Sequence, residues 1–262
     1  MPAAWRALLR IDRYARIVVA ALLAIVIASA APLQGAPSID NPPLPRPRPA
    51  SAPARPAPPP PAAHEVGPEK EKPEIDQACL DRLGAAGIEF EHVVMPAAAK
   101  PGCGIDTPVR LKSIKLAAWP KTSIRLPDGP ILACRFGERF GHWVSRLVAP
   151  LIAGELSTEL RAVRTGPGYE CRNRNRVEAG KISAHATGIA IDVSSFELAS
   201  GKVLAVKPDG DERLRAAFDS IRVAACGWFL TVLGPGSDAA HSDHMHLDIQ
   251  PHGSSDRYRI CQ

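Results

Sequence analysis

The sequence predicts an α+β fold in which helices flank a mainly antiparallel sheet. Three segments carry apolar residues at helical spacing, and five shorter runs have the composition and length of strands. These segments do not follow the regular β-α-β order of a parallel sheet, and their connections are short enough for hairpins. The sequence contains no internal repeat, so we expect an α+β domain and not a repeat array.

The N-terminal segment, residues 1–30, is predicted to direct export. Four arginines precede an uncharged apolar run, and Ala28-Ser29-Ala30 matches a small-x-small cleavage site. The run is about 15 residues long, shorter than the roughly 20 that a membrane-spanning helix needs. We predict a signal peptide, with an uncleaved signal anchor in the inner membrane as the alternative. Either form places the rest of the chain in the periplasm or cell envelope.

Residues 31–74 are predicted to be a disordered linker. Proline and alanine dominate them, and this composition cannot bury a core and favours extended polyproline II structure. At ~3.1 Å per residue, such a linker would hold a domain as much as ~100 Å from its point of attachment. The folded domain should therefore occupy residues 75–262.

Net charge gives no case for nucleic-acid binding. The chain has a formal charge of +5, but four arginines and one aspartate lie in residues 1–30, and without them the charge is +2. The basic character of the chain thus belongs partly to the export signal.

Within the folded domain, the three predicted helices cover residues 76–87, 136–160 and 211–225. Asp76 can cap the first helix, which should end near Gly84 or Gly87. The second contains Pro150, which predicts an interruption at that point. The predicted strands cover residues 162–164, 189–193, 203–206, 229–233 and 245–249.

The cysteines predict disulfides. All six lie beyond residue 30, namely Cys79, Cys103, Cys134, Cys171, Cys226 and Cys261. None forms the Cys-x-x-Cys pair of structural zinc sites. In an oxidising compartment an even, scattered set predicts up to three disulfides, with buried free thiols as the alternative. The pairing stays open, because six cysteines allow fifteen arrangements.

Two segments of the folded domain carry metal-ligand residue types. They are Ser183-Ala-His185-Ala-Thr-Gly188-Ile-Ala190-Ile-Asp192 and His241-Ser-Asp243-His244-Met-His246-Leu-Asp248. Gly188 permits a tight turn, so that His185 and Asp192 can face one point. His244 and His246 are two residues apart and share one face of a strand. A histidine or aspartate alone would more often be a surface or packing residue, but the two segments together predict a metal site.

Imidazole and carboxylate ligands suit Zn²⁺. Three protein ligands with one open position are typical of a catalytic zinc site, where the metal activates a water molecule that attacks a carbonyl carbon. A neighbouring group must take the proton of that water and pass it to the leaving amine.

These motifs resemble those of known zinc peptidases. Ser-x-His-x-x-Gly-x-Ala-x-Asp followed by His-x-His is similar to the pattern of lysostaphin-type, D-Ala-D-Ala-cleaving and hedgehog-type peptidases. The stretch 166–175 resembles the segment before the histidine motif in D-alanyl-D-alanine carboxypeptidase-like members. More closely, residues 79–261 resemble the bacterial extensin-like C-terminal domain, through Gly102-Cys103-Gly-Ile-Asp106, Tyr169-Glu-Cys171-Arg172 and Ala240-His-Ser-Asp-His-Met-His-Leu-Asp248.

The resemblance implies a hedgehog/D-Ala-D-Ala peptidase-like fold, with His185, Asp192 and His246 as zinc ligands. Arg172 matches an arginine that in such peptidases holds the substrate or polarises its carbonyl group. The alternative for Arg172 is a surface arginine beside a disulfide, because the match shifts by one residue around Cys171.

The proton-handling residue is open between two candidates. Members of the superfamily place an acidic residue three positions before the last ligand, here Asp243, while others use the first histidine of His-x-His, here His244. We favour Asp243, although strict strand alternation would place His244 on the metal's face. His241 is a weaker candidate, expected in a loop. Asp248 is in phase with His246 and can orient its imidazole, or is an ordinary strand-end carboxylate.

Together these features predict an exported zinc-dependent peptidase that acts on the stem peptides of peptidoglycan. The alternative is a wall-binding or scaffolding domain that keeps the zinc pocket without turnover. A metallohydrolase of small molecules is less favoured, because a long linker would serve no purpose with a diffusible substrate. The sequence leaves open which peptide bond is cut.

Overall fold

The structure is a computed structural model and describes residues 75–96, 100–116, 119–178, 180–207, 210–253 and 258–262. The predicted export segment and linker lie outside these residues. Within them, no helix is long and apolar enough to cross a membrane.

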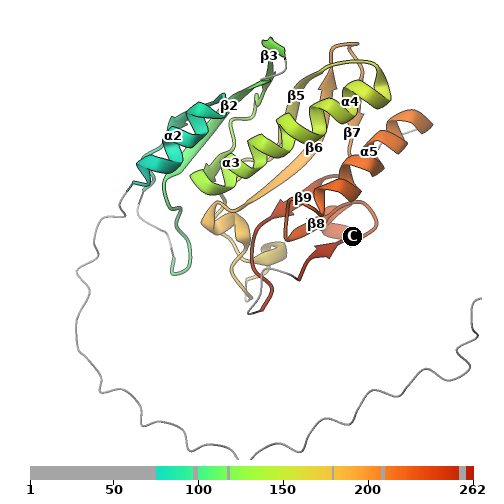
Figure 1. Ribbon diagram of the computed structural model, residues 1–262. Coiled ribbons are helices and arrows are strands. Elements are labelled where there is room, and N and C mark those ends of the chain that lie inside the picture. The colour runs from blue at the N-terminus through green and yellow to red at the C-terminus, as the bar shows by residue number, and fades with distance from the viewer. Residues whose placement is uncertain (1–74, 97–99, 117–118, 179, 208–209, 254–257) are drawn as a thin grey trace, which may run out of the picture. The chain divides into compact units, whose positions relative to one another are not determined.

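The described residues form an α+β domain around one mixed sheet, as the sequence predicts (Figure 1). The main path of the sheet has the order β1-β2-β3-β5-β6-β9-β8-β10, while β4 pairs with β2 and β7 pairs with β6. The β3–β5 and β8–β10 pairs are parallel and the others are antiparallel. The strands are β1 (Ile88–His92), β2 (Pro108–Leu116), β3 (Trp119–Arg125), β4 (Ile131–Ala133), β5 (Leu160–Thr165), β6 (Ala190–Leu198), β7 (Val203–Ala205), β8 (Thr231–Leu233), β9 (Met245–Asp248) and β10 (Ile260–Cys261).

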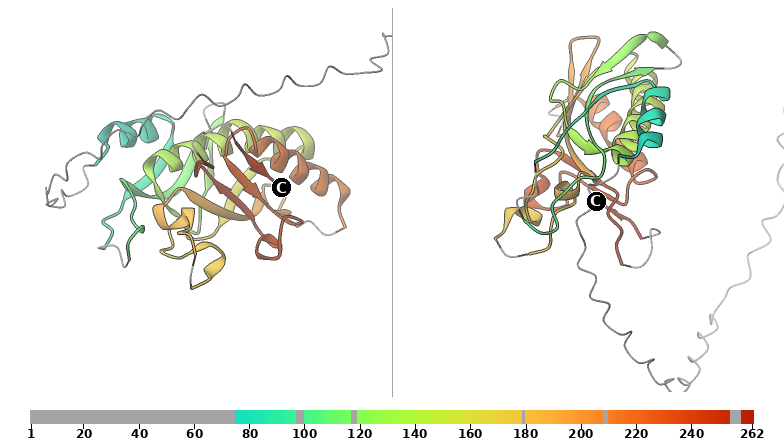
Figure 2. Two further views of the ribbon diagram at one scale, coloured as in Figure 1. Left: turned by 90° about the horizontal axis from the view of Figure 1, so that it is seen from below. Right: turned by 90° about the vertical axis from the view of Figure 1, so that its left-hand side faces the viewer.

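The longer helices cover one face of this sheet. They are α3 (Cys134–Trp143), α4 (Ala149–Leu156) and α5 (Glu212–Ala225), and Figures 1 and 2 show them on the same side. The shorter α2 (Gln77–Ala85) packs beside α3 and β1. Asp76 and Asp211 cap α2 and α5 by accepting backbone N–H bonds, so both helices begin where the sequence predicts.

Pro150 does not break its helix. A π-helical turn, η1 (Val144–Val148), joins α3 directly to α4, and the chain stays helical from residue 134 to residue 156. The wider turn lies just before the proline, where an α-helical hydrogen bond would otherwise need the N–H that proline lacks. The predicted interruption is therefore a local change of helix geometry. The helix ends before Leu160, which begins β5.

An aromatic cluster fills the space between the helices and the sheet. Trp143, Phe136 and Phe140 of α3 meet Phe196 of β6 and Phe229, and all five are fully buried. The ring centroids of Trp143 and Phe229 are 5.5 Å apart in an edge-to-face arrangement. Such pairs add to the stabilisation from apolar burial, so this cluster fixes the helix layer over the strands that carry the site.

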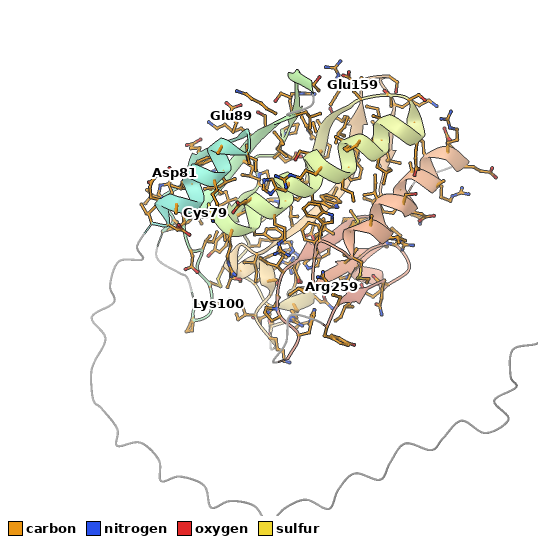
Figure 3. The ribbon with its side chains drawn as sticks, in the orientation of Figure 1. Cys79, Asp81, Glu89, Lys100, Glu159 and Arg259 are labelled. Atoms are coloured by element: carbon orange, nitrogen blue, oxygen red, sulfur yellow. A yellow bond between two sulfur atoms is a disulfide. The ribbon has the colours of Figure 1, made fainter. Side chains whose placement is uncertain are left out.

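All six cysteines form disulfides, which confirms the prediction and supplies the pairing. Cys79, labelled on α2 in Figure 3, bonds to Cys134 in the first turn of α3. The other two join Cys103 to Cys171 and Cys226 to Cys261. The last of these ties the end of α5 to β10, and Arg259 supports it by donating to the carbonyl oxygens of Cys226 and Phe229.

Candidate metal centre

His185 comes from a short turn that one glycine makes possible. The residue lies in the 3-10 helix η3 (Ala184–Thr187) and is 2% exposed. Gly188 ends η3 with a φ of +66°, and a Cβ atom there would lie 2.8 Å from the backbone nitrogen of Ala133. Any other residue at position 188 would therefore meet both backbone strain and a clash. The turn brings the chain from His185 directly into β6.

Asp192 and His246 face each other across two strands. They are partners in the antiparallel register of β6 and β9, and directly opposed residues on such strands place their side chains on the same face of the sheet. The sheet itself thus sets the distance between the carboxylate and the imidazole.

Three ligand atoms converge at this point. His185 Nε2 lies 3.1 Å from His246 Nδ1 and 3.3 Å from Asp192 Oδ1, and the latter two atoms are 2.9 Å apart. The three residues form a group that could hold a metal ion. In tetrahedral zinc sites, bonds of about 2.0–2.1 Å place neighbouring ligand atoms about 3.3 Å apart. The three distances are therefore close to those around one zinc ion. The shortest of them, between His246 Nδ1 and Asp192 Oδ1, would need to lengthen by a few tenths of an ångström.

The two imidazoles are oriented by hydrogen bonds from behind. His185 Nδ1 lies 2.7 Å from the carbonyl oxygen of Gly168, which can only accept, so Nδ1 carries a proton and Nε2 is the nitrogen that can bind a metal. His246 Nε2 lies 3.1 Å from Oδ2 of the buried Asp248. Outer hydrogen bonds of this kind are typical of metal-binding histidines. Asp248 thus has the orienting position that its phase with His246 predicts.

The electrostatics of the triad also suit a cation. Burial alone would raise the pKa of Asp192, but hydrogen bonds and charge from His185 and His246 outweigh it and hold that pKa far below its usual range. Burial alone would lower the pKa of His246, but its bonds to Asp192 and Asp248 raise the pKa to about 9. In the metal-free protein, a proton on His246 therefore provides the positive charge between the two carboxylates that a metal ion would provide in its place.

Two further histidines border the triad. His244 Nε2 lies 3.7 Å from Asp192 Oδ1, and its Nδ1 lies 2.9 Å from Asp243 Oδ1. His241 Nδ1 lies 2.7 Å from Asp238 Oδ1, and its ring centroid is 5.7 Å from that of His246. Each carboxylate accepts a bond from its histidine, which lowers the pKa of Asp243 and of Asp238. In the pairs Asp243–His244 and Asp238–His241, the aspartate thus bonds to Nδ1 of the histidine, so that Nε2 of the same ring can accept a proton.

Asp243 itself does not reach the triad. Its side chain is 86% exposed and bonds to His244 instead. Strand β9 begins only at Met245, so Asp243 lies in the preceding loop, but that loop turns the carboxylate outward. The structure thus brings His244 to the triad and places Asp243 behind it.

Arg172 lies in the wall of the same cavity. The cavity has a volume of about 380 Å³, within the usual range of ligand sites, and His185, Asp192, His241, His244 and His246 also line it. The guanidinium Nε of Arg172 donates to Glu170 at 2.7 Å. Glu170 also pairs with Arg176, and these bonds outweigh the effect of burial and lower its pKa. The Cys103–Cys171 disulfide fixes the chain immediately before Arg172.

The structure adds three features that the sequence did not assign. The acceptor for His185 is a backbone carbonyl, that of Gly168, and no side-chain pattern marks it. His241, the weaker candidate expected in a loop, lines the cavity from the end of a short 3-10 helix, Ala239–His241. Its partner is Asp238, three residues earlier. A signal for this last pair was available, because Asp238 is placed to cap the short helix that carries His241.

Comparison with known proteins assigns the domain to a family. The family model described as the extensin-like protein C-terminus matches residues 77–262, which contain every residue of the centre. No curated protein and no solved structure matches the chain. With the match covering more than half of its length, the chain belongs to the extensin-like C-terminus family.

Proposed function

We propose that this protein is an exported zinc-dependent peptidase that cuts a peptide of the bacterial cell wall. The observation that carries the proposal is the convergence of His185 Nε2, Asp192 Oδ1 and His246 Nδ1 within one cavity. Two imidazoles, each oriented by a hydrogen bond from behind, and one carboxylate form a donor set that zinc peptidases use. The sequence resemblance to lysostaphin-type, D-Ala-D-Ala-cleaving and hedgehog-type peptidases supports the same reading.

His185, Asp192 and His246 would hold the ion. When bound, zinc supplies a Lewis acid that polarises the amide carbonyl and makes a water molecule more acidic. Asp248 and the carbonyl of Gly168 keep the two imidazoles in the tautomers that binding requires. Asp192 is a ligand in this scheme and takes no part in proton transfer.

His244 is the favoured proton acceptor. With its Nδ1 proton donated to Asp243, its Nε2 presents a lone pair to the cavity beside Asp192. That nitrogen can take a proton from the attacking water and return it to the leaving amine. Asp243 then orients His244 and stabilises its charged form, and His241 provides a second imidazole at the same wall. Arg172, which lines the same cavity, would hold the substrate or polarise its carbonyl group.

A cell-wall substrate is supported by the N-terminal part of the chain, residues 1–74. The export segment predicts a protein outside the cytoplasm, and the proline-rich residues 31–74 predict a linker that reaches across a gap. A peptide fixed in the wall is the kind of substrate that a tethered enzyme must reach. Peptidoglycan stem peptides match this location and the substrate habit of the similar peptidases.

Digestion of purified muropeptides by the zinc-loaded protein tests the proposal. We expect a new amine terminus in the products, with cleavage lost on chelation and restored by zinc. His185→Ala should lose the bound metal, expected near one zinc per chain, whereas the control His142→Ala, on α3 and away from the cavity, should keep it. No cleavage by a zinc-loaded protein would overturn the peptidase and favour the wall-binding alternative.

A further inference from the structure

One segment of the cavity wall, residues 170–176, carries more positive charge than its own acid neutralises. Arg172, Arg174 and Arg176 all line it within five residues of sequence. Glu170 pairs with both Arg172 and Arg176. Arg174 forms no ion pair with any residue in the described ranges, and its guanidinium bonds to the neutral Gln250 at 2.9 Å. Three cations with one carboxylate leave this segment with a net positive charge, while the two aspartates that line the cavity, Asp192 and Asp248, are both bonded to His246.

Arg174 is held on the side of the cavity where the triad lies. Its partner Gln250 follows β9, and the Gln250 backbone N–H donates to Asp248 Oδ1 at 2.9 Å. Asp248 in turn bonds to His246. On the other side, the Glu170 N–H donates to the carbonyl of His185. The arginine wall and the triad are therefore joined by short hydrogen-bonded links and have a fixed separation.

The turn that presents these arginines is unusual and braced. Asn175 and Arg176 both have positive φ, of 52° and 59°, a conformation that is uncommon for a residue as large as arginine. The Asn173 amide donates to the carbonyls of Val177 and Glu178, which closes the turn from within. A strained conformation held by its surroundings is a recurrent feature of ligand-binding segments.

We propose that Arg174 and Arg176 form a carboxylate-binding rim, which selects peptides that carry a free carboxylate close to the amide that is cut. The proposal rests on the proposed peptidase function, since it names the substrate class of the same cavity. Arginine suits this task because its planar fork binds a carboxylate through two parallel hydrogen bonds. The rim supplies an anchor outside the reacting centre and leaves Arg172 to act nearer to it.

Binding of matched peptides tests the rim without requiring turnover. The probes are the stem pentapeptide L-Ala–γ-D-Glu–L-Lys–D-Ala–D-Ala and two derivatives, one amidated at the α-carboxylate of D-Glu and one at the C-terminus. Calorimetry would use the zinc-loaded full chain carrying His244→Gln. We expect one of the two amidations to weaken binding about tenfold, as loss of one charged contact predicts, and the affected position identifies the carboxylate that is bound.

Arg174→Gln should bring the ratio of acid to amide affinity close to one, and Arg176→Gln should reduce it. The matched control is Arg215→Gln, which removes an exposed charge from α5 away from the cavity and should leave the ratio at about tenfold. Equal binding of all three peptides, no binding of any, or equal effects of Arg174→Gln and Arg215→Gln would overturn the rim. An Arg174-dependent preference in a protein that cuts nothing would support the rim while the peptidase proposal fails.

Discussion

His244 is the residue on which the proposed chemistry most directly depends. Its two ring nitrogens face different carboxylates, Asp243 at 2.9 Å and Asp192 at 3.7 Å. Because Nε2 alone faces the triad, we expect His244→Gln to lower kcat by about 10²–10⁴-fold while zinc content stays unchanged. Asp243→Asn should lower kcat by only about tenfold, because it removes an orienting bond. Kinetics with zinc analysis would decide, and a larger loss for Asp243→Asn would make Asp243 the base.

His246 predicts how the stability of the metal-free protein depends on pH. Its pKa rises from 6.5 to about 9 in the fold, so its protonated form stabilises the protein below about pH 6.5 and that stabilisation is lost as the pH rises to about 9. We expect the free energy of unfolding to fall by on the order of 3 kcal/mol across this range. Urea denaturation of the metal-free protein measures it, with His246→Gln as control. An equal slope in that variant would assign the effect elsewhere.

Bound zinc should reverse the pH dependence of stability that the metal-free protein shows. The metal competes with protons for the ligand atoms, so zinc affinity increases with pH over the range where metal-free stability falls.

Single residues also mark the limit of prediction from sequence. The glycine turn predicted that His185 and Asp192 face one point, the family resemblance added His246 to them, and the structure brings the three together. The choice between Asp243 and His244 was not decidable from the sequence, because it depends on the direction in which the loop before β9 turns the Asp243 carboxylate. The orienting carbonyl of Gly168 was not predictable, since every residue has such a group.

At the scale of elements, the Cys103–Cys171 disulfide connects a loop to the arginine wall. Removing it by Cys103→Ala with Cys171→Ala should cost up to ~4 kcal/mol, from the length of chain it closes. The Cys79–Cys134 pair closes a loop of similar length, so its removal should cost about as much. Of these two disulfides only Cys103–Cys171 adjoins Arg172. We therefore expect KM to rise in the variant that lacks Cys103–Cys171 and to stay unchanged in the variant that lacks Cys79–Cys134.

Thermal unfolding and kinetics of the two double variants would separate these effects. Equal increases in KM would mean that the disulfide next to Arg172 has no specific influence on the site.

The elements themselves were predictable to different degrees. The five predicted strands correspond to β5–β9 and the three predicted helices to α2, α3–α4 and α5. Strands β1–β4 and β10 were missed. β4 and β10 have only three and two residues, too few to show an alternating pattern, whereas in β2 charged side chains are interspersed with the apolar ones. In β2, Arg110 and two lysines lie among Val109, Leu111 and Ile114, which are fully buried. Long basic side chains can extend to solvent from a strand whose other face is in the core.

At the scale of the whole molecule, residues 75–262 contain all that the centre requires. The three disulfides, the aromatic cluster and the family match all lie within them. We therefore expect a fragment of residues 75–262 to bind zinc with the affinity of the full chain and to unfold at the same temperature. Calorimetry and metal titration of the two proteins would measure this. A fragment with weaker zinc binding would assign residues 1–74 a part in the site.

The class of fold was predictable, but the order of the sheet was not. Irregular alternation of helices and strands indicates α+β, whereas the position of β9 between β6 and β8 depends on contacts between distant segments. That position is what places His246 opposite Asp192. The site therefore depends on topology that no local pattern encodes.

The connectivity of the cysteines has a consequence for how the chain matures. The first two disulfides interleave, because Cys103 lies between Cys79 and Cys134, and Cys134 lies between Cys103 and Cys171. Oxidation in order of synthesis would join Cys79 to Cys103 and Cys134 to Cys171, and neither bond is native. Only Cys226 and Cys261 would pair correctly as neighbours. A chain oxidised as it emerges must therefore exchange its disulfides through mixed intermediates before the arginine wall takes its place, which makes assembly of the site dependent on a disulfide-isomerising environment.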